Sequence, residues 1–424
     1  MIREKDHRYI WHPFSSWSAE PDQVPVVKGK AEFLYDEQGK TYIDAISSWW
    51  VNIHGHSHPY INQKIAEQLA ELEHVIFSGF THSPAVALAQ RLVQKAGQGR
   101  GKIFFSDNGS TSVEVALKLA IQFWKNRGEQ RTVFIAFEGA YHGDTFGSMS
   151  VSERDVFTRA FEKLLFHVEY IPLPTGENIQ EIRQQLAHIL EEQRVAGFIY
   201  EPLVQGAGGM RMYAAEHLQQ LITLVRQQGV LCIADEVMTG FGRTGTFFAS
   251  DQLTERPDML CMSKALTGGY LPMGATWVNE QILSEFMQAT PERTFYHGHS
   301  FTGNPIACAA ANASLDLLEN PAVQQSIADL EFYMAAMAGE FSAHPRLQDV
   351  RACGTILAMD VRVPGEGYFY THPVKKILYD TALENGVLLR PMGNVLYVLP
   401  PYCIREESLE QVRQTLYKCL ESTE

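Results

Sequence analysis

Short apolar runs alternate with longer amphipathic stretches through the middle of this 424-residue chain. The amphipathic stretches 111–127 and 214–228 carry apolar residues three and four positions apart, as helices packed on one face do. The apolar runs are rich in β-branched and aromatic residues and span residues 102–106, 132–137, 197–200 and 230–234. Strands that are apolar throughout and separated by helices predict a mostly parallel sheet covered on both faces, which is an α/β fold.

The chain is too long for one core, because single cores stop growing at roughly 250–300 residues. After residue 320 the pattern changes to that of a smaller α+β unit, with helices expected at 322–341 and 406–420 and strands at 356–361 and 395–399. A strand pair around residues 31–43 is expected to return to this unit. We therefore expect a large domain of residues 51–320 and a small domain built from 1–50 and 321–424.

Charge and cysteine content narrow the class of partner. The net charge of -14 and the lack of a basic stripe argue against nucleic acid and anionic membranes as partners. No stretch approaches the ~20 apolar residues of a membrane-spanning helix, and the N-terminus has no apolar signal core. Six widely spaced cysteines are typical of reduced core residues. We expect a cytoplasmic protein that acts on small molecules.

A carboxylate and a lysine follow two of the predicted strands. Asp235 follows the apolar run Val230-Leu-Cys-Ile-Ala234, and Lys264 follows the run 258–262, a few residues before Gly268 and Gly269. Alone, each would be read as a capping carboxylate or a surface lysine, but both are expected at the ligand-binding edge of the sheet. A lysine forms a Schiff base with an aldehyde cofactor, and a carboxylate facing a pyridine nitrogen keeps that ring protonated. The pair therefore indicates pyridoxal-phosphate chemistry.

Two further segments suit such a cofactor. Gly109 and Ser110 lie between a strand and a helix, where backbone N–H groups at a helix N-terminus bind phosphate, although an ordinary helix cap has the same residues. Tyr141 follows another strand, so its ring is expected to stack on the cofactor, with a core tyrosine as the alternative.

Two aromatic or imidazole-rich motifs are less specific. His54, His56 and His58 do not predict a metal site, since Gly55 and Pro59 interrupt any regular strand, and we expect a turn with solvent-facing imidazoles. In Ser47-Ser-Trp-Trp50, adjacent residues of an extended segment would face opposite ways. One indole would then line a pocket while the other packs in the core.

The motifs together resemble the class III pyridoxal-phosphate aminotransferases over nearly the whole chain. The most specific are Asp235-Glu-Val-Met-Thr-Gly-Phe-Gly-Arg-Thr-Gly245 and Ser263-Lys-Ala-Leu-Thr-Gly-Gly269. The resemblance implies fold type I, pyridoxal 5'-phosphate as cofactor, and Lys264, Asp235 and Tyr141 as catalytic residues. It also implies cofactor contacts from Gly109 and Ser110, and from Ser300 to the cofactor of a neighbouring subunit, so a homodimer is expected.

Within the class, Trp11-His-Pro13, Ser47-Ser-Trp-Trp50 and Leu389-Arg-Pro-Met-Gly393 are similar to members that aminate a long-chain keto acid in biotin biosynthesis. The similarity implies substrate contacts from five residues: Trp49, Trp50, Tyr141, Gly298 and Arg390. Ala207 stands where glutamate-binding relatives hold a glutamate, so Arg390 should remain available for a carboxylate.

One departure bears on the amino donor. Phe14 follows Trp11-His-Pro13 where the best-known members have a tyrosine, so a hydroxyl is missing near the donor. S-adenosylmethionine is the expected donor and lysine the alternative.

Other interpretations of the whole chain are a different omega-amino acid aminotransferase of the class or, with less support, an aminomutase. A sensor protein on this fold would carry a DNA-binding extension, which the sequence lacks.

Overall fold

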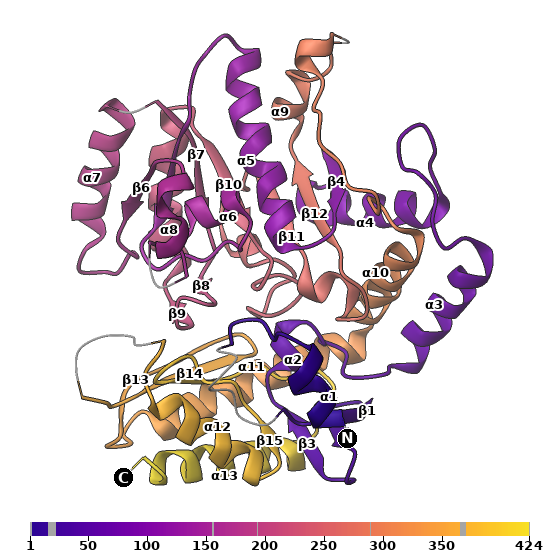
Figure 1. Ribbon diagram of the computed structural model, residues 1–424. Coiled ribbons are helices and arrows are strands. Elements are labelled where there is room, and N and C mark those ends of the chain that lie inside the picture. The colour runs from indigo at the N-terminus through magenta and orange to yellow at the C-terminus, as the bar shows by residue number, and fades with distance from the viewer. Residues whose placement is uncertain are drawn as a thin grey trace.

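The protein is described from a computed structural model, which covers residues 2–15, 23–154, 157–192, 194–288, 290–364 and 370–423. Its main element is a seven-stranded sheet in the order β4-β12-β11-β10-β7-β5-β6 (Figure 1). The strands are β4 (Lys102–Ser106), β5 (Val133–Phe137), β6 (Val168–Ile171), β7 (Val195–Tyr200), β10 (Leu231–Asp235), β11 (Met259–Met262) and β12 (Gly274–Val278). Strand β12 runs antiparallel to both of its neighbours, whereas the other pairings are parallel. The predicted α/β fold with a mostly parallel sheet is confirmed.

Helices cover both faces of this sheet, which is why its central strands are mostly apolar. In β7, Ala196 and Ile199 face the core beneath α5 (Gly109–Asn126), whereas Phe198 and Tyr200 face the core beneath α7 (Ile179–Glu192) and α8 (Ala215–Gln227). All six residues of β7 are buried. The other helices of the large unit are α3 (Pro59–Glu71), α4 (Ser83–Gly97), α6 (Phe146–Val151), α9 (Glu280–Ser284) and α10 (Pro305–Leu318).

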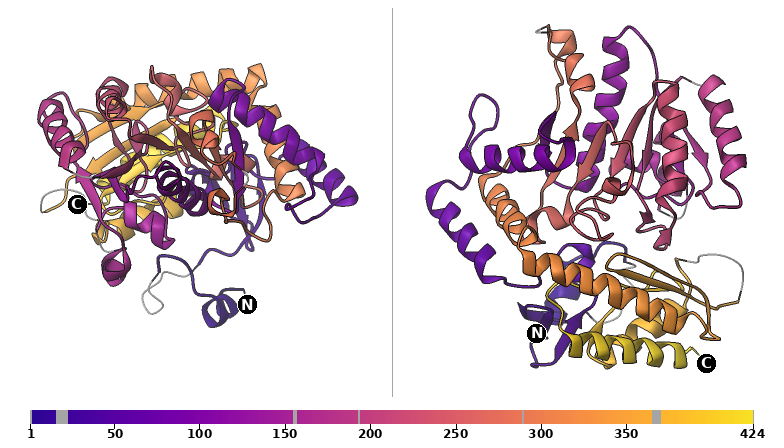
Figure 2. Two further views of the ribbon diagram at one scale, coloured as in Figure 1. Left: turned by 90° about the horizontal axis from the view of Figure 1, so that it is seen from above. Right: turned by 180° about the vertical axis from the view of Figure 1, so that it is seen from behind.

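Segments from the two ends of the chain form the second layered unit (Figure 2). Strand β15 (Val387–Leu388) pairs in parallel with β3 (Thr41–Asp44), which completes a sheet in the order β1-β2-β3-β15. A second sheet has the order β13-β14-β16. The other elements of this unit are β1 (Val26–Lys30), β2 (Phe33–Asp36), β13 (Leu347–Cys353), β14 (Ile356–Val361), β16 (Val395–Val398), α11 (Pro321–Phe341), α12 (Val374–Glu384) and α13 (Glu406–Glu421). This pairing supports the division that we propose between a large domain of 51–320 and a small domain of 1–50 and 321–424.

The small unit lies below one edge of the seven-stranded sheet (Figure 1). Strand β10 ends there at Asp235, β5 ends shortly before Tyr141, and α5 begins there at Gly109 after β4. The carboxyl ends of parallel strands therefore meet the small unit, where an open α/β sheet binds ligands. None of the helices in the described part of the chain is long and apolar enough to cross a membrane.

Candidate active site

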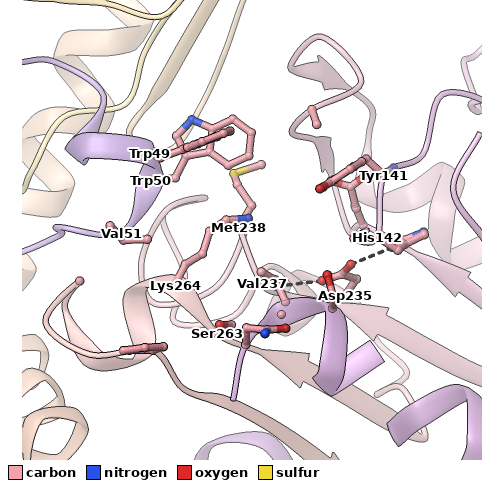
Figure 3. A pocket seen from close by; sticks show the side chains of 18 of the residues that line it. Trp49, Trp50, Val51, Tyr141, His142, Asp235, Val237, Met238, Ser263 and Lys264 are labelled. Atoms are coloured by element: carbon pink, nitrogen blue, oxygen red, sulfur yellow. Dashed lines mark hydrogen bonds and ion pairs between the residues drawn. The ribbon is translucent and has the colours of Figure 1, made fainter. Parts of the chain in front are cut away.

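A pocket of about 440 Å³ lies between the carboxyl edge of the large sheet and the small unit (Figure 3). It brings together eight of the residues that the sequence singled out: Trp49, Trp50, Gly109, Ser110, Tyr141, Asp235, Lys264 and Arg390. Gly298 and Ser300 do not line it and are exposed on the surface of the subunit. The pocket therefore unites eight of the predicted residues, whereas Gly298 and Ser300 lie outside it in the single subunit.

Lys264 begins a short 3₁₀ turn, Lys264–Thr267, directly after β11. Its φ of 44° lies in the left-handed region, which non-glycine residues adopt at a cost and mostly at functional sites. The ammonium nitrogen Nζ lies 4.8 Å from the ring centre of Trp50. Burial lowers the pKa of Lys264, while the carboxylates of Asp235 and Glu201 oppose that shift. A lowered pKa leaves more of the amine uncharged at a given pH, as a nucleophile and proton carrier requires.

Asp235 is buried at the end of β10 and is held in place by a histidine. Its Oδ2 lies 2.7 Å from Nδ1 of His142, and its Oδ1 accepts the backbone N–H of Val237 at 3.1 Å. The Nε2 atom of His142 is also buried and has no hydrogen-bond partner among the described residues. Figure 3 shows Asp235 beside His142, with a dashed line for the interaction between them. The histidine was not singled out from the sequence, although it directly follows Tyr141.

The N-terminus of α5 forms a cup beside this carboxylate. Asn108 caps the helix and accepts the N–H of Thr111 at 3.0 Å. Gly109 has no room for a side chain, because a Cβ there would lie 2.8 Å from Cγ1 of Val237. A Cβ on Gly143 would lie 2.1 Å from Oγ of Ser110, and Gly143 has a φ of 130°. Close backbone approach at a helix N-terminus suits a phosphate group, so these residues fit the phosphate of pyridoxal phosphate.

Tyr141 and Glu201 form the opposite wall. The hydroxyl of Tyr141 donates to Oδ2 of Asp144 at 2.9 Å, and burial raises its pKa above the usual range, with a further increase from Asp144. Glu201 accepts the backbone N–H groups of Tyr141 at 3.2 Å and Gly206 at 2.9 Å. Burial raises the pKa of Glu201 to about 7. Glu201 was missed in the sequence, although it ends an apolar strand as Asp235 does.

The tryptophan pair corrects a prediction. Residues 47–50 are not extended, since Trp49 has a φ of 133° and Trp50 a φ of 72° in a tight turn. Both tryptophans line the pocket, and Trp50 is in addition buried in the hydrophobic core, so the prediction that one of the two packs in the core is borne out although the extended backbone is not. Trp50 also donates from Nε1 to the hydroxyl of Tyr397 at 3.2 Å.

Arg390 lies over the ring of Trp49, with its guanidinium carbon 3.6 Å from the ring centre. It forms no ion pair with a carboxylate among the described residues, and Ala207 lines the pocket without adding a charge. A planar guanidinium stacked on an indole keeps its hydrogen-bonding edge available for a carboxylate. The pocket thus places a lysine against Trp50 and an arginine against Trp49.

The histidines at 54–58 also differ from the prediction of solvent-facing imidazoles. His54 is buried, with Nε2 3.0 Å from Oγ of Ser314, and burial lowers its pKa to about 3. His56 is half-buried and lies 2.8 Å from Asp44. These rings hold helix α10 and the tryptophan turn in place rather than face solvent.

Comparison with known proteins gives consistent results. The sequence profile "Aminotransferase class-III" matches residues 15–420. An adenosylmethionine-8-amino-7-oxononanoate aminotransferase of Synechococcus elongatus is 48% identical over 96% of this chain and 97% of its own length. The crystal structure of the enzyme of that name from Methanocaldococcus jannaschii superposes with a TM-score of 0.94 at 33% identity, covering 99% of this chain and 98% of that one. An amine transaminase from an uncultivated Pseudomonas species, solved in its PLP-bound form, gives 0.90 at 30% identity and covers 97% and 98%.

Proposed function

Since the chain belongs to the class-III aminotransferases, whose cofactor is pyridoxal phosphate, we propose that it aminates 8-amino-7-oxononanoate to 7,8-diaminononanoate in biotin biosynthesis. The amine is proposed to come from S-adenosylmethionine. The relatives named for this reaction match over nearly the full length of the chain. Donor and acceptor would use the same pocket in turn.

Pyridoxal phosphate, when bound, supplies an aldehyde that takes up the amino group and a ring that withdraws electrons from the reacting carbon. Lys264 is proposed to hold that aldehyde and then, once a substrate amine has replaced it, to move a proton at Nζ. Asp235 would keep the ring nitrogen protonated, and His142 fixes that carboxylate at 2.7 Å. Tyr141 would lie against the ring, while Gly109 and Ser110 would receive the phosphate.

One observation carries the choice of acceptor. Arg390 and Lys264 rest on adjacent indoles of one pocket, at 3.6 Å from Trp49 and 4.8 Å from Trp50. A keto acid with a distal carboxylate can therefore meet the guanidinium while its ketone reaches the lysine. The aromatic wall between the two charges suits an apolar chain.

Lysine remains a second candidate for the donor because of Phe14. Its ring packs edge-on against Trp49 at 5.5 Å and Phe157 at 5.7 Å, so the pocket has an apolar surface where the resemblance implies a hydroxyl. S-adenosylmethionine is retained as the first choice, since adenosylmethionine is part of the names of the related enzymes.

We also propose a cytoplasmic homodimer in which Gly298 and Ser300 serve the pocket of the other subunit. Residues 73–82 pack against residues 301–304, as shown by Asn304 donating to the carbonyl of Glu73 at 3.1 Å and His82 contacting the carbonyl of Gly303 at 2.7 Å. This junction exposes three large apolar side chains: Ile76 (59%), Phe80 (65%) and Phe301 (63%). An exposed apolar patch beside Ser300 suits a subunit interface.

The role of Arg390 in binding the acceptor is tested by comparing Arg390→Ala and Arg390→Lys. Each of the two half-reactions is followed in a single turnover. Loss of a charge-assisted, bidentate partner costs about 1.5–3 kcal/mol, so Arg390→Ala should weaken the acceptor half-reaction by about tenfold or more. Arg390→Lys should be partly active, since it keeps the positive charge but loses the planar pair of N–H donors that binds both oxygens of a carboxylate. The donor half-reaction should change less. Equal damage to both halves would contradict the role of Arg390 as the acceptor clamp.

A further inference from the structure

The turn that carries the two tryptophans has a backbone that residues other than glycine rarely adopt. Four residues in succession have a positive φ: 48° at Ser47, 56° at Ser48, 133° at Trp49 and 72° at Trp50. Each of these conformations raises the energy of the folded chain and persists only where the surrounding structure fixes it. Specific contacts must therefore hold this turn in place.

The carboxylate of Asp44, at the end of β3, binds this turn through both of its oxygen atoms. Oδ1 accepts the backbone N–H of Ser48 at 2.8 Å, and Oδ2 accepts the hydroxyl of the same serine at 2.7 Å. The side chain of Asp44 has no exposed surface, so water does not compete for these bonds. Hydrogen bonds to a charged acceptor are short and strong. The residue directly before Trp49 is thus bound twice to one buried carboxylate.

The carboxylate is itself fixed from the other side by His56. Nε2 of His56 donates to Oδ2 of Asp44 at 2.8 Å, and the backbone N–H of His56 donates to the carbonyl of Ala31 at 2.7 Å. Together with the backbone N–H of Ile46, 3.3 Å from Oδ1, these donors match the roughly four lone-pair sites of an ionised carboxylate. Asp44 therefore cannot simply follow a movement of the turn.

Asp44 also lies beside the strand that leads to Arg390. In the parallel pair of β3 and β15, Asp44 is opposite Leu388, and the N–H of Ala45 donates to the carbonyl of Leu388 at 3.3 Å. Arg390 follows two residues later, with its guanidinium carbon 3.6 Å from the ring centre of Trp49. Asp44 thus joins the segment that carries Trp49 to the strand that leads to Arg390, although it does not line the reaction pocket.

We propose that Asp44 is a positioning residue for the acceptor, because it holds the turn through Ser48 and so keeps Trp49 under the guanidinium of Arg390. The inference rests on the proposed function, in which Arg390 binds the carboxylate of the keto acid. Asp44 touches neither substrate nor cofactor and takes no part in proton transfer. When the bonds from Ser48 are weakened, Trp49 leaves its place and Arg390 loses its support. Affinity for the acceptor then falls more than the rate of its reaction.

Ser48→Ala tests this inference because it removes only the bond between the hydroxyl and the carboxylate. Ser57→Ala is the matched control: Ser57 has a similar φ of 53° but is exposed, and its hydroxyl forms no hydrogen bond with the described residues. The acceptor half-reaction is followed in a single turnover over a range of 8-amino-7-oxononanoate concentrations. Ser48→Ala should need about tenfold more acceptor for half of its maximal rate, which corresponds to roughly 1.4 kcal/mol, with the maximal rate little changed. Ser57→Ala should behave as the wild type.

Asp44→Asn extends the test to the carboxylate. The amide nitrogen cannot accept hydrogen bonds from Ser48 and His56 together, so the effect should have the same direction as that of Ser48→Ala and be larger. If this variant does not fold, Ser48→Ala decides the question alone. Thermal unfolding of each variant shows whether it is folded.

A double-mutant cycle separates positioning from a general structural effect. If Ser48 acts through Trp49 and Arg390, adding Ser48→Ala to Arg390→Ala should change the acceptor requirement by less than about twofold, whereas independent effects would add in full. A full additive effect, or a Ser48→Ala that equals the wild type, would overturn the inference and leave the proposed function intact. A wild-type holoenzyme that does not react with 8-amino-7-oxononanoate would instead refute the proposed function, and the inference with it.

Discussion

At the scale of single residues, the environment of Lys264 explains how one side chain can serve two roles. Its left-handed backbone aims the amine into the pocket, and its burial lowers the pKa. Asp235 and Glu201 oppose that shift, so burial and the two carboxylates act on the pKa of the amine in opposite directions. A group that must both bind an aldehyde and exchange protons uses its neutral and its charged form in turn.

Lys264→Ala should abolish the yellow colour of the lysine-linked cofactor and reduce turnover by at least about 10³-fold, because the imine partner and the proton carrier are lost together. Absorbance spectra and steady-state rates check this. Lys118→Ala, which changes an exposed lysine on α5, is the control and should keep the colour. Near-normal turnover of Lys264→Ala would contradict the assignment.

Asp235→Asn should lower kcat far more than it lowers cofactor affinity. The ring nitrogen loses its charge partner, whereas the cup at Gly109 and Ser110 remains. Equilibrium dialysis of the cofactor and rates at saturating cofactor separate the two effects. Activity equal to that of the wild type at saturating cofactor would rule out a charge role for Asp235.

At the scale of elements, the N-terminus of α5 supplies directed N–H groups that no single side chain provides. The capping box of Asn108 and Thr111 fixes the first turn, and Oγ of Ser110 accepts the N–H of Asp144 at 3.1 Å. The helix N-terminus and the Tyr141 segment are therefore held together at the position of the proposed phosphate.

Ser110→Ala should weaken binding of pyridoxal phosphate about tenfold or more, because a hydrogen bond to a charged group contributes about 1.5–3 kcal/mol. Ser112→Ala is a matched control in the same turn, since Oγ of Ser112 donates to the carbonyl of Gly109 and does not line the pocket. Titration of the apo-protein with cofactor measures both. Equal affinity of the two variants would argue against the phosphate role of Ser110.

The strand and helix rhythm of the large sheet could be predicted because strands buried on both faces must be apolar throughout. The antiparallel direction of β12 could not be predicted, since the residues Gly274–Val278 would suit a parallel or an antiparallel strand. The turn at 47–50 depends on distant contacts, such as Oγ of Ser47 donating to the carbonyl of Leu399 at 3.0 Å. Likewise His54 is buried because of Ser314, far along the chain. Sequence spacing therefore indicated which residues lie near the pocket, but it did not predict the backbone conformation that places them there.

At the scale of the whole molecule, the pocket exists only because the two ends of the chain meet the large sheet. Trp49 and Trp50 come from the N-terminal segment and Arg390 from the C-terminal one, while Lys264 and Asp235 come from the sheet. The proposed dimer would add a residue of a second chain to the pocket. Ser300 is exposed in the single subunit and would be that residue.

Phe80→Glu should shift the protein from dimer to monomer and reduce cofactor retention, because a charge would be buried in the proposed interface and Ser300 of the other subunit would be lost. Phe332→Glu is the control, since Phe332 is also exposed, at 78%, but lies on α11 in the small unit. Sedimentation velocity and cofactor content measure the outcome. A monomeric wild type with full cofactor content would contradict the proposed dimer.

The most direct test of the proposed function is mass spectrometry of the products formed from 8-amino-7-oxononanoate by the holoenzyme. With S-adenosylmethionine present, the account predicts 7,8-diaminononanoate in an amount equal to the donor consumed, and none from Lys264→Ala. If 7,8-diaminononanoate forms with lysine as the sole donor, only the assignment of the donor would change. Absence of the diamine with either donor, from wild-type enzyme that carries its full cofactor, would contradict the proposed reaction.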